Sequence, residues 1–167
     1  MTFGDAVITC FRKYFTFSGR ASRSEYWWFF LFCTLGGFIS GFVESLINAV
    51  SGTPGGPTLL SGAFNLVTFI PGLSVGWRRM HDSGRSGLYL LYPIIAIFGM
   101  ITFIGFFGDT EALTATPDAI FDGVFGTVVL ISLLVIALSP LIVIWWLCRP
   151  SQPGPNTYGP NPHEVPQ

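Results

Sequence analysis

The sequence predicts an all-α integral membrane protein with four transmembrane helices arranged in two hairpins. Half of its 167 residues are hydrophobic and only 10% are charged, whereas a soluble domain usually carries about 25% charged residues. The apolar residues gather in four runs, each long enough for the roughly 20 residues that cross a bilayer. All Lys and Arg residues lie in segments that flank these runs on the same predicted side of the membrane.

Residues 1–20 form a predicted cytoplasmic segment with an amphipathic helix that is too short to span the bilayer. Phe3, Val7 and Phe11 share one face of this helix. The pattern is typical of an interfacial helix, which lies in the headgroup region of the membrane. Packing of the helix on the protein's own cytoplasmic face explains the pattern equally well.

The predicted transmembrane domain, residues 21–148, begins with helices at about 23–50 and 59–77. Ser22 and Glu25 have the spacing of a capping box, in which each side chain accepts a hydrogen bond from the backbone amide of the other residue. This box predicts the start of the first helix. The turn that follows the helix is rich in Gly and Pro, which end helices.

A compact charged turn, Trp77–Gly87, connects the second helix to a third at about 87–107, and it carries three of the chain's eight basic residues. A fourth helix is predicted at about 123–147. Residues 149–167 form a Pro-rich cytoplasmic tail without apolar periodicity, which predicts an extended conformation. The connection between the third and fourth helices is acidic, with Asp109, Glu111, Asp118 and Asp122.

The charge distribution predicts that both termini lie in the cytoplasm. The predicted outer side has no Lys or Arg and carries Glu44 together with the acidic third connection. Such asymmetry follows the positive-inside rule. Tryptophans favour the membrane interface, and all five lie at predicted cytoplasmic helix ends: Trp27, Trp28, Trp77, Trp145 and Trp146.

Glycines and prolines indicate where the predicted helices approach one another or bend. Small residues four apart let helices pack closely, and the sequence has two such pairs, Gly37 with Gly41 and Gly72 with Gly76. Kinks at three prolines of similar predicted depth would open a cavity towards the cytoplasm: Pro71, Pro93 and Pro140. Plain tolerance of proline in membrane helices is the alternative.

The predicted cytoplasmic surface gathers residues that suit an anion-binding site, for example for a phospholipid headgroup. Guanidinium groups near helix N-termini attract phosphate, and the candidate contacts are Arg20, Arg23, Arg78, Arg79 and Arg85. Five further residues are expected to order this cluster: Glu25, His81, Asp82, Asn156 and Tyr158. In the alternative interpretation, the arginines pair with Glu25 and Asp82 and hold the helix ends together.

No residue pattern indicates a catalytic, metal or cofactor site. We find no nucleophile–base set, Gly-rich phosphate loop or metal-ligand spacing, and the cysteines suit roles as small apolar core residues. Glu44 is the one acidic residue inside an apolar helix. An ionisable residue in a membrane helix is a functional candidate, but the position near the outer helix end favours contact of this carboxylate with water.

Three segments resemble the signatures of a known family: Phe17–Trp27, Arg78–Gly87 and Asn156–Pro162. In this order they are similar to the motifs of the YhaH-like family, small bacterial inner-membrane proteins built on a domain of unknown function. The resemblance covers about residues 8–162 and implies a four-helix inner-membrane protein without an established activity. Because the third motif lies in the tail, we expect that motif to fold back onto the charged turn.

The leading functional hypothesis is a non-enzymatic membrane protein whose basic cytoplasmic surface binds anionic lipid or a partner protein. A small oligomeric transporter or channel with a cavity open to the cytoplasm is the second hypothesis. The third is a membrane enzyme that acts on lipid phosphate. No nucleic-acid partner is expected, and self-association of the chain stays open.

Overall fold

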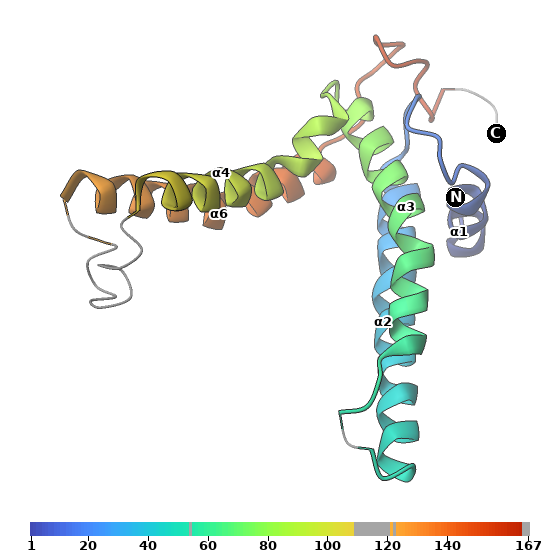
Figure 1. The fold of residues 1–167 in the computed structure, drawn as a ribbon. Coiled ribbons are helices and arrows are strands. Elements are labelled where there is room, and N and C mark those ends of the chain that lie inside the picture. Colours follow the sequence, from blue (N-terminus) through green and yellow to red (C-terminus); the bar gives the residue numbers. More distant parts are fainter. Residues whose placement is uncertain (54, 109–120, 122, 165–167) are drawn as a thin grey trace. The chain divides into compact units, whose positions relative to one another are not determined.

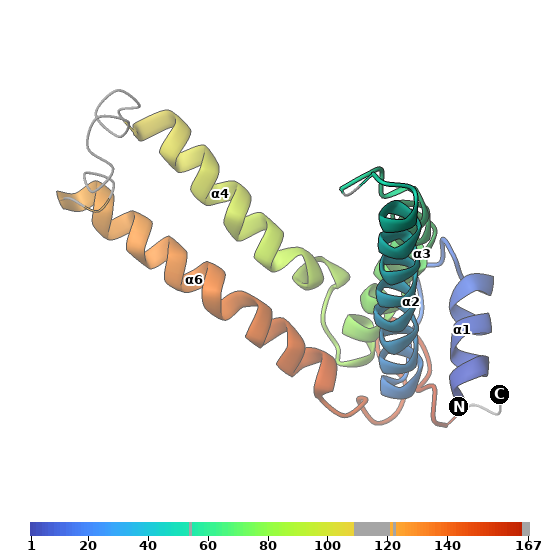
Figure 2. The same ribbon diagram turned by 90° about the horizontal axis from the view of Figure 1, so that it is seen from below.

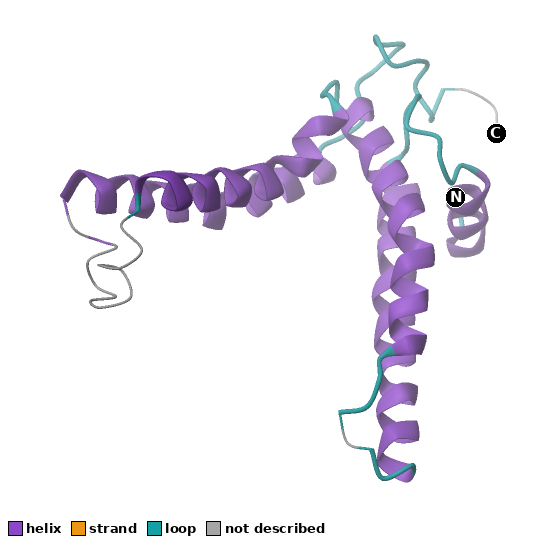
Figure 3. Ribbon diagram, in the orientation of Figure 1, coloured by secondary structure: helices purple, strands orange, loops and turns teal. Residues whose placement is uncertain are grey.

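The computed structural model describes residues 1–53, 55–108, 121 and 123–164, so the acidic residues of the third connection lie outside the described residues. Figure 3 shows helices and loops and no strand in the described part. Four helical stretches are long and apolar enough to cross a membrane, which confirms the predicted all-α membrane class. In chain order the helices are α1 (Phe3–Arg12), α2 (Arg23–Val50), α3 (Leu59–Asp82), the 3-10 helix η1 (Gly87–Leu91), α4 (Tyr92–Phe107) and α6 (Gly123–Cys148).

The chain divides into two compact units. The first, which we call the polar unit, consists of Met1–Gly87 and Pro150–Gln167. The second, which we call the apolar unit, consists of Leu88–Arg149. The tail therefore belongs to the same unit as the N-terminal half of the chain, although the whole apolar unit separates the two in sequence.

In the polar unit, α2 and α3 lie side by side (Figures 1 and 2). α2 begins after Ser22, whose Oγ accepts a hydrogen bond from the Glu25 amide at 3.2 Å. Only this half of the predicted capping box is present, because the Glu25 carboxylate accepts a hydrogen bond from Arg78 instead. The side chain that was expected to cap its own helix thus connects α2 to α3.

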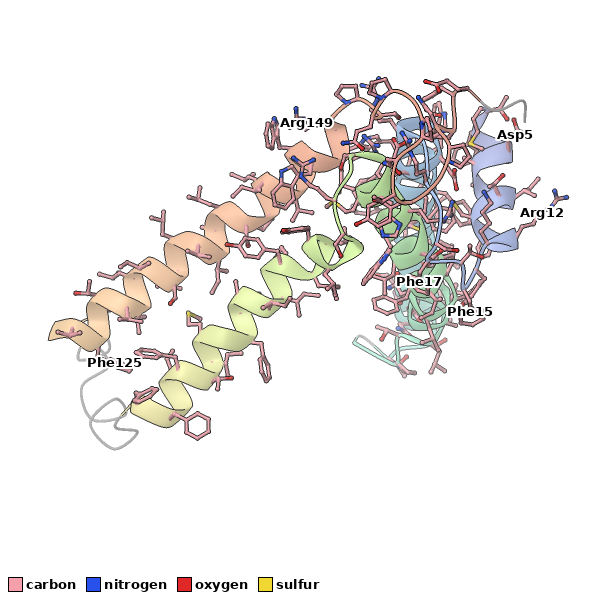
Figure 4. All side chains as sticks on the ribbon, turned by 90° about the horizontal axis from the view of Figure 1, so that it is seen from above. Asp5, Arg12, Phe15, Phe17, Phe125 and Arg149 are labelled. Carbon is pink, nitrogen blue, oxygen red and sulfur yellow. The ribbon has the colours of Figure 1, made fainter. Side chains whose placement is uncertain are left out.

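α1 packs against both α2 and α3. Thr2 and Asp5 close its first turn with a capping box, and Cys10 lies in a buried apolar cluster with Phe29 of α2 and Val75 of α3. Arg12 points away from these helices (Figure 4). The helix therefore has one face packed on the protein itself, as in the second of the two interpretations of its sequence pattern.

α3 ends at Asp82, beyond the predicted end at residue 77. The predicted boundary assumed that charged residues leave the helix, whereas Arg78 and Arg79 stay helical and are buried against carboxylates. At 1.5 Å per residue, the 24 residues of α3 span about 36 Å, more than the hydrocarbon core of about 30 Å. The helix is therefore long enough to cross the membrane and still keep its charged end outside the hydrocarbon.

The close approach between α2 and α3 occurs at Gly36, outside the predicted glycine pairs. A Cβ atom at Gly36 would overlap the ring of Phe64 from α3. A Cβ atom at Gly41 would have nothing within 4 Å, and one at Gly37 or Gly72 would make an ordinary contact of 3.8 Å. The small residue is thus needed where an aromatic ring lies against the helix, a requirement that glycine spacing alone does not reveal.

In the apolar unit, α4 and α6 pack side by side, with aromatic contacts towards both ends. The ring centroids of Tyr89 and Trp146 are 5.3 Å apart, and so are those of Phe103 and Phe125. None of the residues of α4 is buried within the chain. Apolar side chains exposed in this way are expected for helices that face lipid.

The position of Pro93 corrects the prediction of three kinks at one depth. Because residues 87–91 form a 3-10 helix, α4 begins only at Tyr92 and Pro93 lies in its first turn. A proline there removes no helical hydrogen bond and causes no kink. Pro71 and Pro140 lie inside their helices as predicted.

Candidate functional site

Three segments that are far apart in sequence meet at one end of the polar unit: the connection between α1 and α2, the end of α3, and the tail (Figure 1). Their side chains form what we call the arginine–carboxylate cluster, which consists of Arg20, Glu25, Arg78, Arg79 and Asp82. All five are buried. The predicted convergence of these segments is confirmed.

Asp82 is the centre of the cluster. Its Oδ1 accepts a hydrogen bond from Nε of Arg20 at 2.9 Å, and its Oδ2 accepts one from Nη1 of Arg79, one helical turn away. The Ser151 hydroxyl donates to Oδ2 at 2.5 Å, and the Gln152 amide donates to the backbone carbonyl of Asp82 at 3.0 Å. One carboxylate therefore joins the connection before α2, the end of α3 and the beginning of the tail.

Arg20 holds the tail through backbone carbonyls. Its Nη2 donates to the carbonyl of Gln152 at 2.6 Å, and its Nη1 donates to the carbonyl of Gly154 at 2.8 Å. With Nε on Asp82, each nitrogen of the guanidinium has an acceptor. The planar fork of arginine suits this task, because its five N–H groups point in fixed directions.

Arg78 and Glu25 form the second buried ion pair, with Nη1 of the arginine 2.6 Å from Oε1 of the carboxylate. The backbone carbonyl of Arg78 accepts a hydrogen bond from the Ala21 amide at 3.1 Å. Nε and Nη2 of Arg78 are buried without a hydrogen-bond partner in the described part of the chain. The arginines of the cluster thus pair with Glu25 and Asp82, as the alternative interpretation of the sequence expected.

His81 is the main contact of the tail motif. Its ring stacks on that of Tyr158, with centroids 3.9 Å apart and an angle of 5° between the planes. Nδ2 of Asn156 donates to the backbone carbonyl of His81 at 3.0 Å, and Nδ1 of the histidine lies 3.1 Å from the carbonyl oxygen of Gly19. These contacts confirm that residues 156–162 fold back onto the end of α3.

The other two candidate arginines lie outside this buried cluster. Arg23, the first residue of α2, is exposed, and Arg85 is half-buried. Nη1 of Arg85 donates to the carbonyl of Ser83 at 3.0 Å. The structure therefore separates the five predicted arginines into three with buried carboxylate partners and two with access to the surroundings.

A pocket of about 450 Å³ adjoins the cluster. Its charged lining residues are Lys13, Arg20 and Glu25, and Pro160 and Pro162 of the tail form part of its wall. Sequence analysis missed Lys13, because its position at the end of an amphipathic helix looks like that of any surface lysine. It also missed Ser151, whose hydroxyl contacts Asp82.

Glu44 has a structural role at the opposite end of the α2–α3 pair. Its Oε1 accepts a hydrogen bond from the Leu60 amide at 2.8 Å, and its Oε2 accepts one from the Ser61 hydroxyl at 2.5 Å. The residue is only 7% exposed but lines a pocket of about 370 Å³ at this end of the helix pair, so contact of its carboxylate with water stays a prediction. A carboxylate near the first amides of α3 stabilises that helix end, where Thr58 makes no side-chain cap.

Comparisons with known proteins agree with the resemblance seen in the motifs. No solved structure matches the chain. Two Escherichia coli K12 proteins are similar to it: the inner membrane protein YhaH, 26% identical over 158 residues, or 95% of this chain and 96% of that protein, and the inner membrane protein YhaI, 35% identical over 100 residues, or 60% of this chain and 80% of that protein. The family described as "Protein of unknown function (DUF805)" matches residues 14–160, and the chain therefore belongs to this family.

Proposed function

We propose that the protein is a non-enzymatic, multi-pass inner-membrane protein that binds anionic phospholipid headgroups on the basic surface of its polar unit. Both termini lie in the cytoplasm, and the four membrane-crossing stretches form two hairpins. The inner-membrane location is supported by the names of the similar proteins. The orientation is supported by the one-sided distribution of Lys and Arg along the sequence.

The observation that carries this proposal is that the cations of the polar unit fall into two classes. Three arginines are buried in the arginine–carboxylate cluster, where they fix the connection before α2 and the tail. Arg12, Lys13 and Arg23 are exposed. Each cation near an anionic membrane surface contributes about 1 kcal/mol of attraction, so these three are the proposed direct contacts, together with the half-buried Arg85.

The composition of the exposed side of α1 supports its place in the headgroup region. Phe3 and Ile8 of α1 are exposed, as is Phe15 just after the helix, and Arg12 and the C-cap Lys13 at the end of α1 are exposed as well. Aromatic and aliphatic side chains beside cations are typical of interfacial helices. α1 thus packs one face on α2 and α3 and offers the remainder to lipid.

The test compares retained lipid between charge-removing and charge-keeping variants. The first variant carries Arg12→Gln, Lys13→Gln and Arg23→Gln, and the second carries Arg12→Lys, Lys13→Arg and Arg23→Lys. Both are purified from membranes of known composition in mild detergent, and bound phosphatidylglycerol is counted by native mass spectrometry. We expect the first variant to lose most bound phosphatidylglycerol and the second to keep it.

The same spectra provide the control, because retention of zwitterionic phosphatidylethanolamine depends far less on these charges. Equal loss of both lipids in the Gln variant would indicate a general effect of damage to the fold. Unchanged phosphatidylglycerol in the Gln variant would disprove the proposed function.

A further inference from the structure

The buried cluster and the adjoining pocket carry more positive than negative charge. The cluster contains three arginines and two carboxylates, and the pocket adds the ammonium of Lys13. Glu164 is exposed at the end of the tail and accepts hydrogen bonds from Gly154 and Asn161 there. A positive excess in a partly buried site is stabilised by an anion, because the attraction between charges is stronger away from bulk water.

Arg78 is paired with a residue of the pocket wall and, in the described part of the chain, has hydrogen-bond donors without a partner. It is only 1% exposed, yet its Nε and Nη2 have no hydrogen-bond partner among the described residues. Its Nη1 binds Glu25, and Glu25 itself lines the pocket. Buried polar groups in native proteins nearly always have a partner, so these two nitrogens are candidates to donate to an acceptor that enters the pocket next to Glu25.

The remaining lining of the pocket suits a tetrahedral oxyanion. Thr9, Thr16 and Ser18 provide hydroxyl groups, and hydroxyls together with a lysine ammonium are common ligands of phosphate oxygens. Thr16 and Ser18 lie in the loop after α1, which is fixed to α3 because the Ser74 hydroxyl donates to the carbonyl oxygen of Thr16 at 2.7 Å. A volume of about 450 Å³ lies within the usual range of small-molecule sites.

The tail connects the pocket to the cluster. Pro160 and Pro162 form part of the pocket wall, and the segment before them is held by the Arg20 guanidinium at the carbonyls of Gln152 and Gly154. Arg20 is thus in contact with the tail and also lines the pocket. A ligand in the pocket would bind beside the group that fixes the tail.

We propose that this pocket is a specific site for one phosphate group, with Lys13 as its exposed cation and Arg78 as its buried donor. The inference deepens the proposed function, on which it rests for the cytoplasmic position of the pocket. The phosphate belongs either to a phospholipid headgroup or to a soluble phosphate ester, since the same ligands recognise both. In contrast to the diffuse attraction of a basic surface, the pocket binds one phosphate with saturation.

The test compares Lys13→Gln with Arg149→Gln. Both residues are exposed, but only Lys13 lines the pocket, and Arg149 is not one of the proposed lipid contacts. The full chain is placed in nanodiscs of neutral phosphatidylcholine and titrated with inorganic phosphate and with glycerol phosphate, and the affinity is measured by calorimetry. A second set of nanodiscs contains a small fraction of phosphatidylglycerol, and 31P NMR reports an immobilised headgroup.

We expect saturable binding in at least one of these arms, weakened roughly tenfold or more by Lys13→Gln and little changed by Arg149→Gln. Binding of the soluble phosphates would identify the ligand as a soluble phosphate ester. Immobilisation of phosphatidylglycerol without binding of the soluble phosphates would identify it as a phospholipid headgroup. The proposed phosphate site would be disproved if no saturable binding occurred in either arm, or if both variants weakened binding equally. Neither result would contradict the proposed lipid-binding surface. Saturable binding of a soluble phosphate that depends on Lys13 would stand even if lipid retention by the triple variant, which also lacks Lys13, proved unchanged.

Discussion

The polar unit and the apolar unit are each stabilised internally by a different kind of interaction. The polar unit buries three arginines and two carboxylates where the tail meets the helices. In the apolar unit, α4 buries no residue, and the contacts between α4 and α6 include aromatic pairs such as Phe103 with Phe125. Apolar helices in lipid gain little from hydrophobic burial, because the lipid is as apolar as the partner helix.

The comparison shows where the fold is specified most strictly. Buried charges tolerate only one arrangement of partners, since an unpaired buried charge is costly. Apolar contacts between lipid-facing helices accept many substitutions of similar volume. The three motif segments of the sequence all lie in the polar unit, so substitutions there are expected to have the larger effects.

The largest effect is expected for Asp82→Asn. The change removes the carboxylate that pairs with Arg20 and Arg79, and breaking a buried pair from one side costs about 3–5 kcal/mol. We expect a lower midpoint of thermal unfolding and faster chymotrypsin cleavage after Tyr158, because the tail loses its anchor. Glu164→Gln, at an exposed carboxylate of the tail, is the control, and equal stability of the two variants would contradict the central role of Asp82.

A smaller effect is expected at the contact between α2 and α3. Gly36→Ala forces a methyl group onto the Phe64 ring, and overpacking of this kind costs about 1–3 kcal/mol. Gly41→Ala is the matched control, since a Cβ atom there has nothing within 4 Å. Thermal unfolding in detergent should separate the two variants, and a greater loss for Gly41→Ala would indicate that the predicted spacing pair is the true contact.

A still smaller effect is expected for Tyr158→Ala, which removes the ring stacked on His81. Stacked aromatic pairs contribute about 0.5–1.5 kcal/mol beyond area burial. Amide hydrogen exchange in the tail of this variant should be faster, while unfolding of the helices changes little. Tyr158→Phe keeps the ring and should behave like the natural protein; if it behaves like the alanine variant, the hydroxyl and not the stack holds the tail.

The sequence predicted the membrane class and the convergence of three segments, because both depend on composition and on motif order along the chain. It did not predict that α3 continues to Asp82. A run of charged residues looks like a loop unless their partners are known, and the partners Arg20 and Glu25 come from distant segments. Long-range pairing of this kind has no local signal in one sequence.

The role of Glu44 and the contact at Gly36 escaped prediction for the same reason. Glu44 caps the following helix across a turn, and the sequence shows only an acid inside an apolar run. Position 36 requires glycine because the Phe64 ring of the neighbouring helix lies against it, and this contact depends on the register between the two helices. Local patterns predicted each helix, whereas the contacts between helices needed the structure.

The last prediction compares the reactivity of two cysteine thiols, one from each unit, and involves no change in stability. Burial, as the main cause, raises the pKa of the Cys10 thiol in the polar unit to about 12, whereas Cys148 of the apolar unit is exposed. Only the thiolate reacts with alkylating agents, so at pH 8 about one Cys10 in ten thousand is reactive. We expect a maleimide to label Cys148 first in the Cys33→Ala background, with Cys10 labelled only after denaturation. Mass spectrometry of tryptic peptides measures both sites, and prompt labelling of Cys10 would mean that α1 separates from α2 and α3 in the native protein.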